Sequence, residues 1–178
     1  MKTIIIAFFF LLIPVQALSA SEALIRSVFR KAGVSAGEVR LELADGYFMC
    51  GNSWSQACLT AGQNPKIRIT ESLSDTAFEF SLLHELGHYA TYAILPRDQW
   101  EYAADRFAAE RFIAGKTIAL DLCSYPWCWR RKRVSAYIPS FAAFTAWRDS
   151  LNRQYRPAYF RFANYRISDN LNSIYFGQ

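Results

Sequence analysis

Histidine is scarce in this chain, and its scarcity limits the chemistry open to the protein. The 178 residues include two histidines, His84 and His88, so a site that needs three imidazoles is excluded. The chain has no internal repeat and no low-complexity stretch, which argues against a repeat architecture. After the N-terminal segment no apolar run is long enough to cross a bilayer, and no change of composition separates two domains.

A large excess of one charge is also missing. The formal net charge is +5, from 20 Lys and Arg against 15 Asp and Glu, and it falls to +4 without Lys2. This value suits a protein that works near anionic envelope polymers, but it suits one with no charged partner equally well. Hydrophobic residues make up 52% of the chain, which is enough for one domain with a sizeable core.

The chain begins with the pattern of a secretory signal peptide. Lys2 is followed by a short apolar run and by small residues up to Ala20. We expect residues 1–20 to be removed, with cleavage after Ala17 or Ala20. Residues 21–178 are then expected to be secreted or periplasmic, with no stable membrane insertion. An uncleaved N-terminal anchor helix is the alternative.

Export changes how the four cysteines are interpreted, because oxidising compartments favour disulfides over thiolate metal ligands. The cysteines form two close pairs, and Cys50 with Cys58 and Cys123 with Cys128 is the simplest connectivity. Two other connectivities are possible, and a four-cysteine zinc site is a further alternative. Neither pair has the two-residue gap typical of zinc knuckles, so we favour disulfides.

Hydrophobic periodicity predicts a mixture of helices and strands. Helices are expected over 21–32, 74–94, 97–114 and 139–155, and strands over 39–43, 47–50 and 66–70. Asp45-Gly46 has the composition of a tight hairpin turn between the first two strands, and 51–64 is expected to be a loop closed by the first cysteine pair. Residues 124–138 and 157–178 show no assignable pattern. The expected fold is a single α+β domain with a small mixed or antiparallel sheet and a helical C-terminal half.

The predicted helix 74–94 carries a His-Glu-x-x-His pattern, from His84 to His88. Histidines one turn apart on a helix face the same way, so both rings can bind one metal ion, while Glu85 lies beside the expected water. Zinc lowers the pKa of such a water, and the carboxylate can accept its proton and pass it to the leaving amine. Because the pattern uses both histidines of the chain, we favour a metal site over two incidental core histidines.

A catalytic zinc site needs three protein ligands and an open position, and here the third ligand cannot be a histidine. On the next predicted helix, Glu101 and Asp105 lie one turn apart on a shared face. If the two helices pack antiparallel, Glu101 can reach the metal and Asp105 can bind the outer ring nitrogen of a ligand histidine. Both acids can also be ordinary solvated residues, with Asp98, Glu110 or Asp121 as the ligand.

Together these motifs resemble those of the gluzincin metallopeptidases. The segment from His84 to His88 matches the first motif, and the segment from Glu101 to Asp105 is similar to the Glu-x-x-Ala-Asp motif of the branch that holds stress proteases and prenyl-protein proteases. The resemblance implies a zincin-like fold and one zinc ion bound by His84, His88 and Glu101, with Glu85 as catalytic base and Asp105 behind a ligand. The chain departs from that branch by lacking its transmembrane helices and by having its motifs closer together, and so looks more like small exported metallopeptidases.

The resemblance also suggests a strand that could pair with the substrate, and the reaction requires a residue that stabilises the oxyanion. Zincin-like folds commonly place an edge strand beside the active-site helix, where it pairs with an extended peptide. We assign this role to 66–70, with a purely structural place in the core sheet as the alternative. Candidates for stabilising the oxyanion are Tyr155, Tyr159, Tyr165 and Arg166.

The stretch 127–133 combines two tryptophans with four consecutive cations. It can bind anionic glycan, nucleic acid or a membrane surface, but a solvated basic face on a disulfide-closed loop is the simpler interpretation. The sequence contains no recognisable nucleic-acid-binding module, so no nucleic-acid partner is expected.

The sequence thus predicts an exported zinc-dependent metallopeptidase that hydrolyses bonds of a peptide or protein substrate with a metal-activated water. The first alternative is a catalytically idle zinc protein that binds anionic envelope polymers through the basic aromatic surface. Glu85 argues against it, because zinc binding alone does not need that carboxylate. A hydrolase of a non-peptide amide is the third hypothesis.

Overall fold

The computed structural model of this chain describes residues 22–124, 131–155 and 158–162 and the single positions 171 and 175. In chain order the elements are α1 (Glu22–Ala32), β1 (Arg40–Ala44), β2 (Phe48–Cys50), β3 (Ser53–Ser55), β4 (Ala57–Thr60), β5 (Lys66–Thr70), α2 (Asp75–Thr91), the 3-10 helix η1 (Arg97–Gln99), α3 (Trp100–Ile113), β6 (Lys116–Ser124), β7 (Arg131–Ile138), α4 (Phe141–Gln154) and β8 (Ala158–Phe162). The protein is a small α+β domain, as expected, and the predicted helices correspond to α1, α2, α3 and α4. The predicted signal peptide lies outside the described residues.

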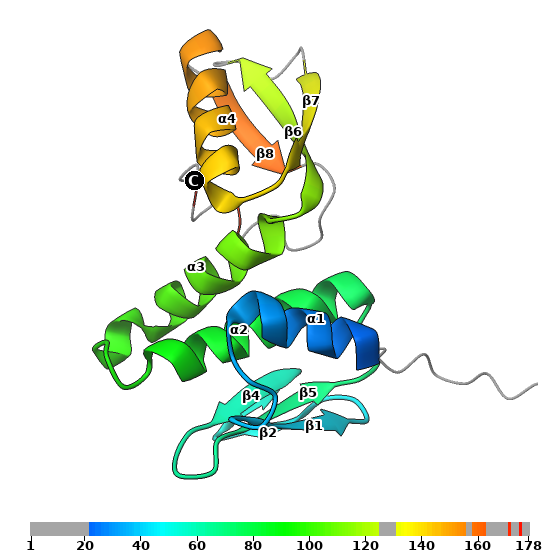
Figure 1. The fold of residues 1–178 in the computed structure, drawn as a ribbon, viewed down its shortest axis with the longest axis vertical. Coiled ribbons are helices and arrows are strands. Elements are labelled where there is room, and N and C mark those ends of the chain that lie inside the picture. Colours follow the sequence, from blue (N-terminus) through cyan, green and yellow to red (C-terminus); the bar gives the residue numbers. More distant parts are fainter. Residues whose placement is uncertain (1–21, 125–130, 156–157, 163–170, 172–174, 176–178) are drawn as a thin grey trace, which may run out of the picture.

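The first sheet has its strands in the order β1-β5-β4, with α1 and α2 packed over it (Figure 1). β5 pairs in parallel with β1 and antiparallel with β4. Ile67 and Ile69 are fully buried, whereas Arg68 between them is exposed. The alternation along β5 therefore gives the sheet one apolar face for the helices.

Two expectations for this region are wrong. Asp45-Gly46 does not close a hairpin, because β1 pairs with β5 while β2 pairs with β3 in a separate two-stranded sheet. Instead the Thr70 hydroxyl donates to the Gly46 carbonyl at 2.6 Å and holds this turn at the end of β5. The segment 51–64 is not a loop, since it contains β3 and β4.

The place of β4 also corrects the assignment of the substrate-pairing strand. β5, which is the predicted strand 66–70, lies in the middle of its sheet between β1 and β4. Its main-chain groups are used on both sides, so it cannot pair with a peptide. The alternative, a core strand, is confirmed, and β4 forms one edge of the sheet, with β1 at the other.

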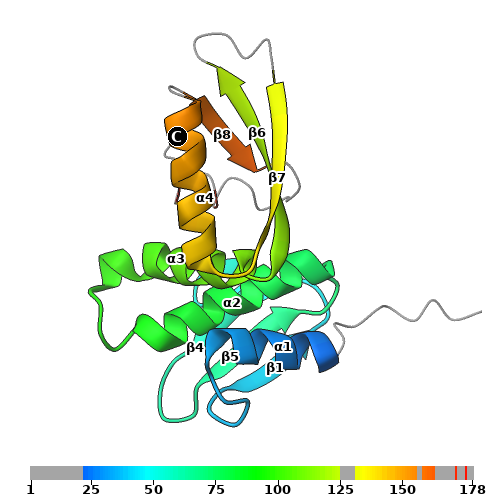
Figure 2. The ribbon, with the colours of Figure 1, turned by 45° about the horizontal axis from the view of Figure 1, so that its top comes forward.

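α2 and α3 pack side by side as an antiparallel pair joined by a short connection (Figures 1 and 2). α2 begins after Ser74, whose hydroxyl accepts a hydrogen bond from the Ala77 N–H at 3.4 Å. α3 ends just before Gly115, which has a φ of 76° that favours glycine. These local signals mark where α2 begins and where α3 ends, and the short connection makes the two helices antiparallel.

The C-terminal half contains the helices α3 and α4, as expected, and also three strands that were not predicted. It combines α4 with an antiparallel sheet of order β7-β6-β8 (Figure 2). Ile118, Leu120 and Leu122 alternate along β6 and are buried. Ser140 caps α4 by accepting a hydrogen bond from the Ala143 N–H at 3.3 Å.

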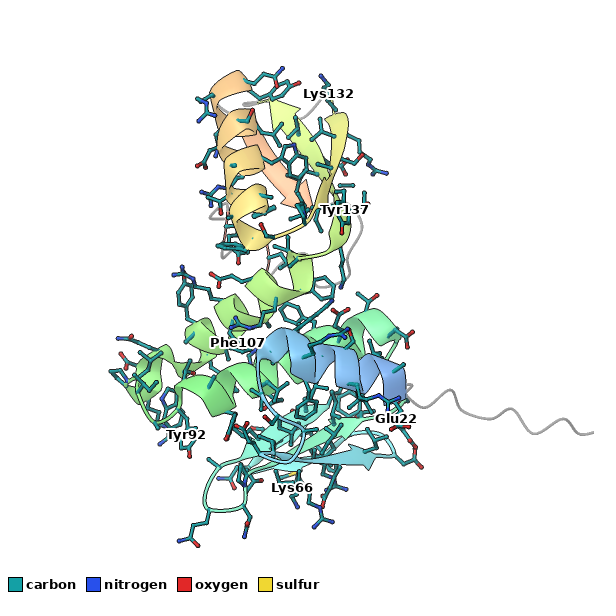
Figure 3. All side chains as sticks on the ribbon, in the orientation of Figure 1. Glu22, Lys66, Tyr92, Phe107, Lys132 and Tyr137 are labelled. Carbon is teal, nitrogen blue, oxygen red and sulfur yellow. A yellow bond between two sulfur atoms is a disulfide. The ribbon has the colours of Figure 1, made fainter. Side chains whose placement is uncertain are left out.

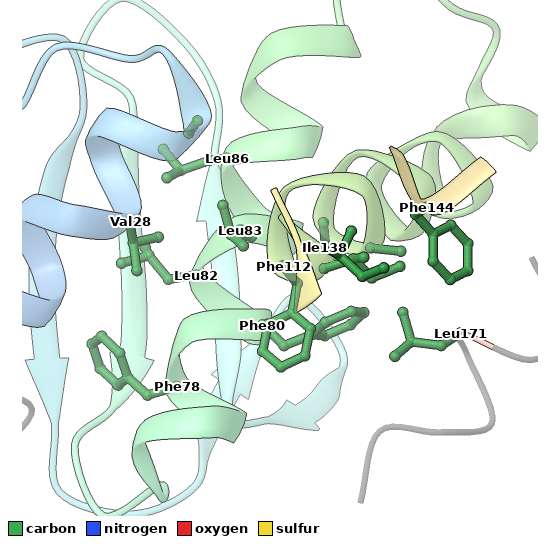
Figure 4. Packing of buried hydrophobic residues seen from close by; sticks show 14 of the residues in the cluster. Val28, Phe78, Phe80, Leu82, Leu83, Leu86, Phe112, Ile138, Phe144 and Leu171 are labelled. Carbon is green, nitrogen blue, oxygen red and sulfur yellow. The ribbon is translucent and has the colours of Figure 1, made fainter. Parts of the chain in front are cut away.

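A continuous apolar core connects the two halves (Figure 4). Phe78 and Leu82 of α2 are fully buried in it, and Phe112 of α3 and Phe144 of α4 extend it toward the C-terminal sheet. At about 25 cal/mol per Å² of apolar surface, burial of such side chains is the main stabilising contribution. Among the described residues, none of the helices combines the length and apolar character that crossing a membrane requires.

A buried ionic cluster joins α1, α2 and β6. Glu79 is 7% exposed, and its two carboxylate oxygens accept hydrogen bonds from the Lys31 and Lys116 ammonium groups at 2.7 Å each. Lys116 also lies 3.2 Å from the centroid of the Phe112 ring. Burial lowers the pKa of Lys116 to about 8 although Glu79 favours its charged form. A buried charge with such partners is tolerated in the folded state, but removing one partner lowers the free energy of unfolding.

Candidate metal centre

The two histidines lie on α2, one helical turn apart. The His84 and His88 rings have their centroids 4.6 Å apart with planes at 87°, and their side chains are 19% and 14% exposed. The two histidines are therefore one helical turn apart, as the sequence predicts, and both rings face the same side of the helix.

Glu101 reaches these histidines because α3 packs very closely against α2 at Gly87. A β-carbon at Gly87 would lie 2.9 Å from the Ala104 Cα and 3.1 Å from the Phe107 Cβ, nearer than such atoms pack. Glycine at this position lets the helix backbones touch. The contact brings Glu101, in the first turn of α3, opposite the two histidines.

The ligand atoms of His84, His88 and Glu101 converge. They lie within 4.8 Å of one another, a group that can hold a metal ion. The two Nε2 atoms are each 3.4 Å from an oxygen of Glu101. Two ligand atoms around one tetrahedral zinc ion lie about 3.4 Å apart, whereas a direct charge-assisted hydrogen bond is about 2.7–2.9 Å. The spacing and the nitrogen and oxygen donors therefore fit a shared ion better than a direct His–Glu pair.

Asp105 lies behind His84, as predicted. The His84 Nδ1 and the Asp105 Oδ1 are 2.9 Å apart, so an Nδ1–H donates to the carboxylate and leaves Nε2 as the acceptor. Burial disfavours the protonated ring, but the hydrogen bond and charge of Asp105, with Glu85 and Glu101, outweigh it and raise the pKa of His84. Burial and the neighbouring His84 lower the pKa of His88.

Glu85 is buried beside the same group. Its residue is 7% exposed, and its carboxylate accepts a hydrogen bond from the main-chain N–H of Leu59 in β4. Burial raises the pKa of Glu85 to about 7, while His84 and the Leu59 N–H pull it down. A carboxylate that titrates near neutrality is suited to accepting and returning a proton. Sequence reasoning missed Leu59, because a main-chain donor leaves no mark in the side-chain pattern.

A cavity of about 510 Å³ opens over these groups. Its lining includes His84, His88, Glu101 and Glu85. The segment from β2 to the residue after β4 contributes Cys50, Ser55, Ala57, Cys58, Leu59 and Ala61, and the segment that joins α2 to α3 contributes Tyr92, Arg97 and Trp100. The Trp100 indole N–H donates to the Leu95 carbonyl at 2.8 Å, which holds that ring in place. Tyr92, Arg97 and Trp100 were not predicted as site residues, although their closeness in sequence to the metal helix was a signal.

The chain was compared with family models, with curated proteins and with solved structures. None matches. The resemblance to gluzincins therefore depends on the two motifs, and the family remains a prediction.

The first predicted disulfide is present. Cys50 and Cys58 are bonded, with their Cα atoms 6.0 Å apart, and both line the cavity. The bond ties β2 to β4 at the wall that also holds Leu59. Cys128 lies outside the described residues, so its pairing with Cys123 remains a prediction.

The alternative acidic ligands lie elsewhere. Glu110 accepts a hydrogen bond from Arg106 at 2.9 Å, and Asp121 accepts one from Arg133 at 2.9 Å. Neither belongs to the group of described residues that can hold a metal, and the same is true of Asp98.

The remaining predicted residues contribute little to the described site. The Tyr155 hydroxyl accepts a hydrogen bond from Lys132 at 2.7 Å at the end of α4, away from the residues that line the cavity. The side chains of Tyr159, Tyr165 and Arg166 lie outside the described part of the chain. So does most of the basic aromatic stretch, of which Lys132 and Arg133 are described, each with a partner.

Proposed function

We propose that this protein is a zinc-dependent metallopeptidase with His84, His88 and Glu101 as metal ligands and Glu85 as catalytic base. The observation that carries the proposal is the convergence of the three ligand atoms next to a buried carboxylate at the edge of an open cavity. Three protein ligands with a cavity beside them are the arrangement of catalytic zinc sites, whereas structural sites are closed by a fourth ligand.

Bound zinc supplies Lewis acidity toward water and toward a carbonyl oxygen. His84, His88 and Glu101 hold their lone pairs toward one point and leave the cavity side open. Asp105 keeps His84 in the tautomer that offers Nε2. Glu85 receives a proton from the attacking water and returns it to the leaving amine, and its pKa near 7 suits both transfers.

The edge strand favours a peptide over another amide. β4 lines the cavity from Ala57 to Leu59, and it lies at the edge of its sheet. An extended peptide can add to such an edge through main-chain hydrogen bonds, which small non-peptide amides cannot do at several positions. The substrate class that this wall supports is therefore an extended peptide segment.

An idle zinc protein that binds anionic polymers receives less support. Such a protein needs neither the buried Glu85 nor a cavity at the metal, and two cations of the basic stretch are engaged by Tyr155 and Asp121. Export through the N-terminal segment is part of the proposal, and the Cys50–Cys58 disulfide is in keeping with an oxidising compartment.

Elemental mass spectrometry of the folded, disulfide-intact protein tests the ligand set. About one zinc per chain is expected for the wild type and for Glu85→Gln, and a strong loss is expected for Glu101→Ala. Glu110→Ala is the matched control, since it removes a glutamate of the same helix that is paired with Arg106. A wild type that binds no zinc when zinc is supplied would refute the proposal.

A peptide library then tests the reaction. Wild-type protein with zinc should cleave internal or terminal peptide bonds, and Glu85→Gln with a full zinc content should not. Equal cleavage by both proteins would remove Glu85 from its proposed role.

A further inference from the structure

The proposed metallopeptidase has one feature in its cavity that the hydrolysis of a peptide bond does not explain. Arg97 lines the cavity, and it is the one lysine or arginine among the described residues that do so. Within the described part of the chain it has no ion-pair or hydrogen-bond partner, whereas Arg106 on the following helix is paired with Glu110. An arginine beside a binding cavity with its five N–H donors unused is available to a ligand.

The nearest acid on the same side does not use Arg97. Glu101 follows it by one helical turn, but the Glu101 oxygens lie toward His84 and His88 at 3.4 Å. No ion pair joins Arg97 and Glu101 in the described structure. Arg97 is an exposed residue at the cavity, and its guanidinium does not serve to hold the metal ligand.

The net charge of the residues that line the cavity also favours an anionic ligand. Glu101 and the ionised form of Glu85 contribute at most two negative charges, and a divalent cation at the histidines offsets them. Arg97 then leaves the occupied cavity with one excess positive charge. An anionic substrate group is favoured in such a cavity, because the low-dielectric walls strengthen the attraction.

The surroundings of Arg97 also suit a bound chain end or side chain. Tyr92 directly follows α2, Trp100 begins α3, and Arg97 lies in η1 between them, so all three come from one short segment (Figure 3 labels Tyr92). Trp100 is fixed by its bond to the Leu95 carbonyl. Two aromatic residues and an arginine from this segment thus line the same cavity as β4.

We propose that Arg97 binds a carboxylate of the substrate and so determines which peptides the enzyme prefers. This inference rests on the function proposed above. Carboxylates are the anions that an ordinary peptide carries, at its C-terminus and on its aspartate and glutamate side chains. The planar guanidinium matches the two oxygens of a carboxylate, which gives the contact its specificity.

Binding is measured first, in a zinc-loaded Glu85→Gln background that does not turn over. The probes are dansyl-labelled tetra-alanine with a free C-terminal carboxylate, the same peptide as its carboxamide, and carboxamides that carry one glutamate or one glutamine. Fluorescence anisotropy should show that a carboxylate lowers Kd by about tenfold. The free-acid peptide and the glutamate peptide separate the two sources of the carboxylate.

Three variants identify the residue. Arg97→Gln should give equal Kd values for the acid and the carboxamide. Arg97→Lys should retain part of the preference, because lysine keeps the positive charge but lacks the planar pair of N–H donors that matches a carboxylate. Arg106→Gln, which removes the same charge outside the cavity, should leave the preference unchanged. A preference that survives in Arg97→Gln would overturn the inference.

Kinetics on the active protein distinguish a binding role from a role in the transition state. Arg97→Gln should raise KM about tenfold for the carboxylate peptide, with kcat nearly constant and with the carboxamide unaffected. A similar loss of kcat for both peptides would mean that Arg97 acts on the reacting carbonyl, and the inference would be wrong. If the wild type cleaves acid and carboxamide equally well, the inference fails and the proposed function stands. If zinc-loaded protein neither binds nor cleaves any peptide, the proposed function fails and the inference fails with it.

Discussion

Two glutamates of α2 have the same burial and different surroundings. Glu79 and Glu85 are each 7% exposed and lie six positions apart. Glu79 is held by two ammonium groups, from Lys31 and Lys116, at 2.7 Å. Glu85 has a main-chain N–H from Leu59 and the nearby His84, but no lysine or arginine partner in the described part of the chain.

The difference shows how one helix can serve stability at one end and chemistry at the other. The charge of Glu79 is bound by two cations, so this residue holds three elements together. Glu85 is left with a pKa near 7 because burial is not balanced by a cation. Its surroundings cost stability and make it a usable base, which is the usual compromise at active sites.

The largest effect is expected for Glu85, the proposed catalytic base. Glu85→Gln should lower kcat for a cleaved peptide by about a thousandfold, because the amide cannot accept a proton. Its thermal midpoint should be equal to or above that of the wild type, since a buried carboxylate has been neutralised. Steady-state kinetics and a thermal melt on the same sample check both parts. A large fall in the midpoint would show that Glu85 is needed for folding.

Glu79→Gln should instead lower the stability of the protein and leave its zinc content and activity unchanged. Removing the charge leaves two ammonium groups partly buried without a counter-ion, so the free energy of unfolding should fall by about 2–3 kcal/mol. The zinc content and kcat of the folded fraction should be unchanged. Urea unfolding measures the loss, and Glu110→Gln, which breaks the exposed Arg106–Glu110 pair, is the control with an expected change under about 0.5 kcal/mol.

Asp105→Asn tests whether a carboxylate behind a ligand histidine affects zinc affinity and leaves stability unchanged. The amide retains a polar contact with His84 but loses the negative charge that makes the ring a stronger ligand. Zinc affinity should fall about tenfold, as measured by competition with a chelating dye, while the midpoint of the metal-free protein changes little. An unchanged affinity would show that Asp105 does not act on the ligand.

The smallest effect concerns pH and Lys116. Its pKa falls from 10.5 to about 8 on folding, so between these values the unfolded chain binds more protons. Stability should therefore rise as the pH increases from about 8 to 10.5, by an amount of the order of 1 kcal/mol. Urea unfolding at pH 8 and 10 should show a smaller rise in Lys116→Met than in the wild type, and equal rises would contradict the prediction.

The sequence predicts the part of the site that is local. His84, Glu85 and His88 are positioned by the helix itself, and Ser74 marks where that helix begins. Glu101 could be assigned as a ligand because a short connection makes the next helix antiparallel. The convergence of these residues is present in the structure, and their roles remain predictions.

The strands were harder to predict because their pairing is not local. Along β6 the buried residues Ile118, Leu120 and Leu122 alternate, but they follow directly after a helix and the pattern was not assigned. In β7 a run of cations hides a similar alternation. The segment that contains β4 has no strong pattern, because it is an edge strand whose position depends on the Cys50–Cys58 bond and on β5.

The exposure of Glu101 has a consequence for the metal-free protein. Its side chain is 80% exposed, so one ligand of the proposed ion faces solvent. α2 and α3 pack against each other and into the apolar core through other residues, so we expect the fold to persist without the ion. We therefore expect a chelator to withdraw the metal from a protein that keeps its shape, so that the supply of zinc would set how much of the folded protein holds the proposed ion.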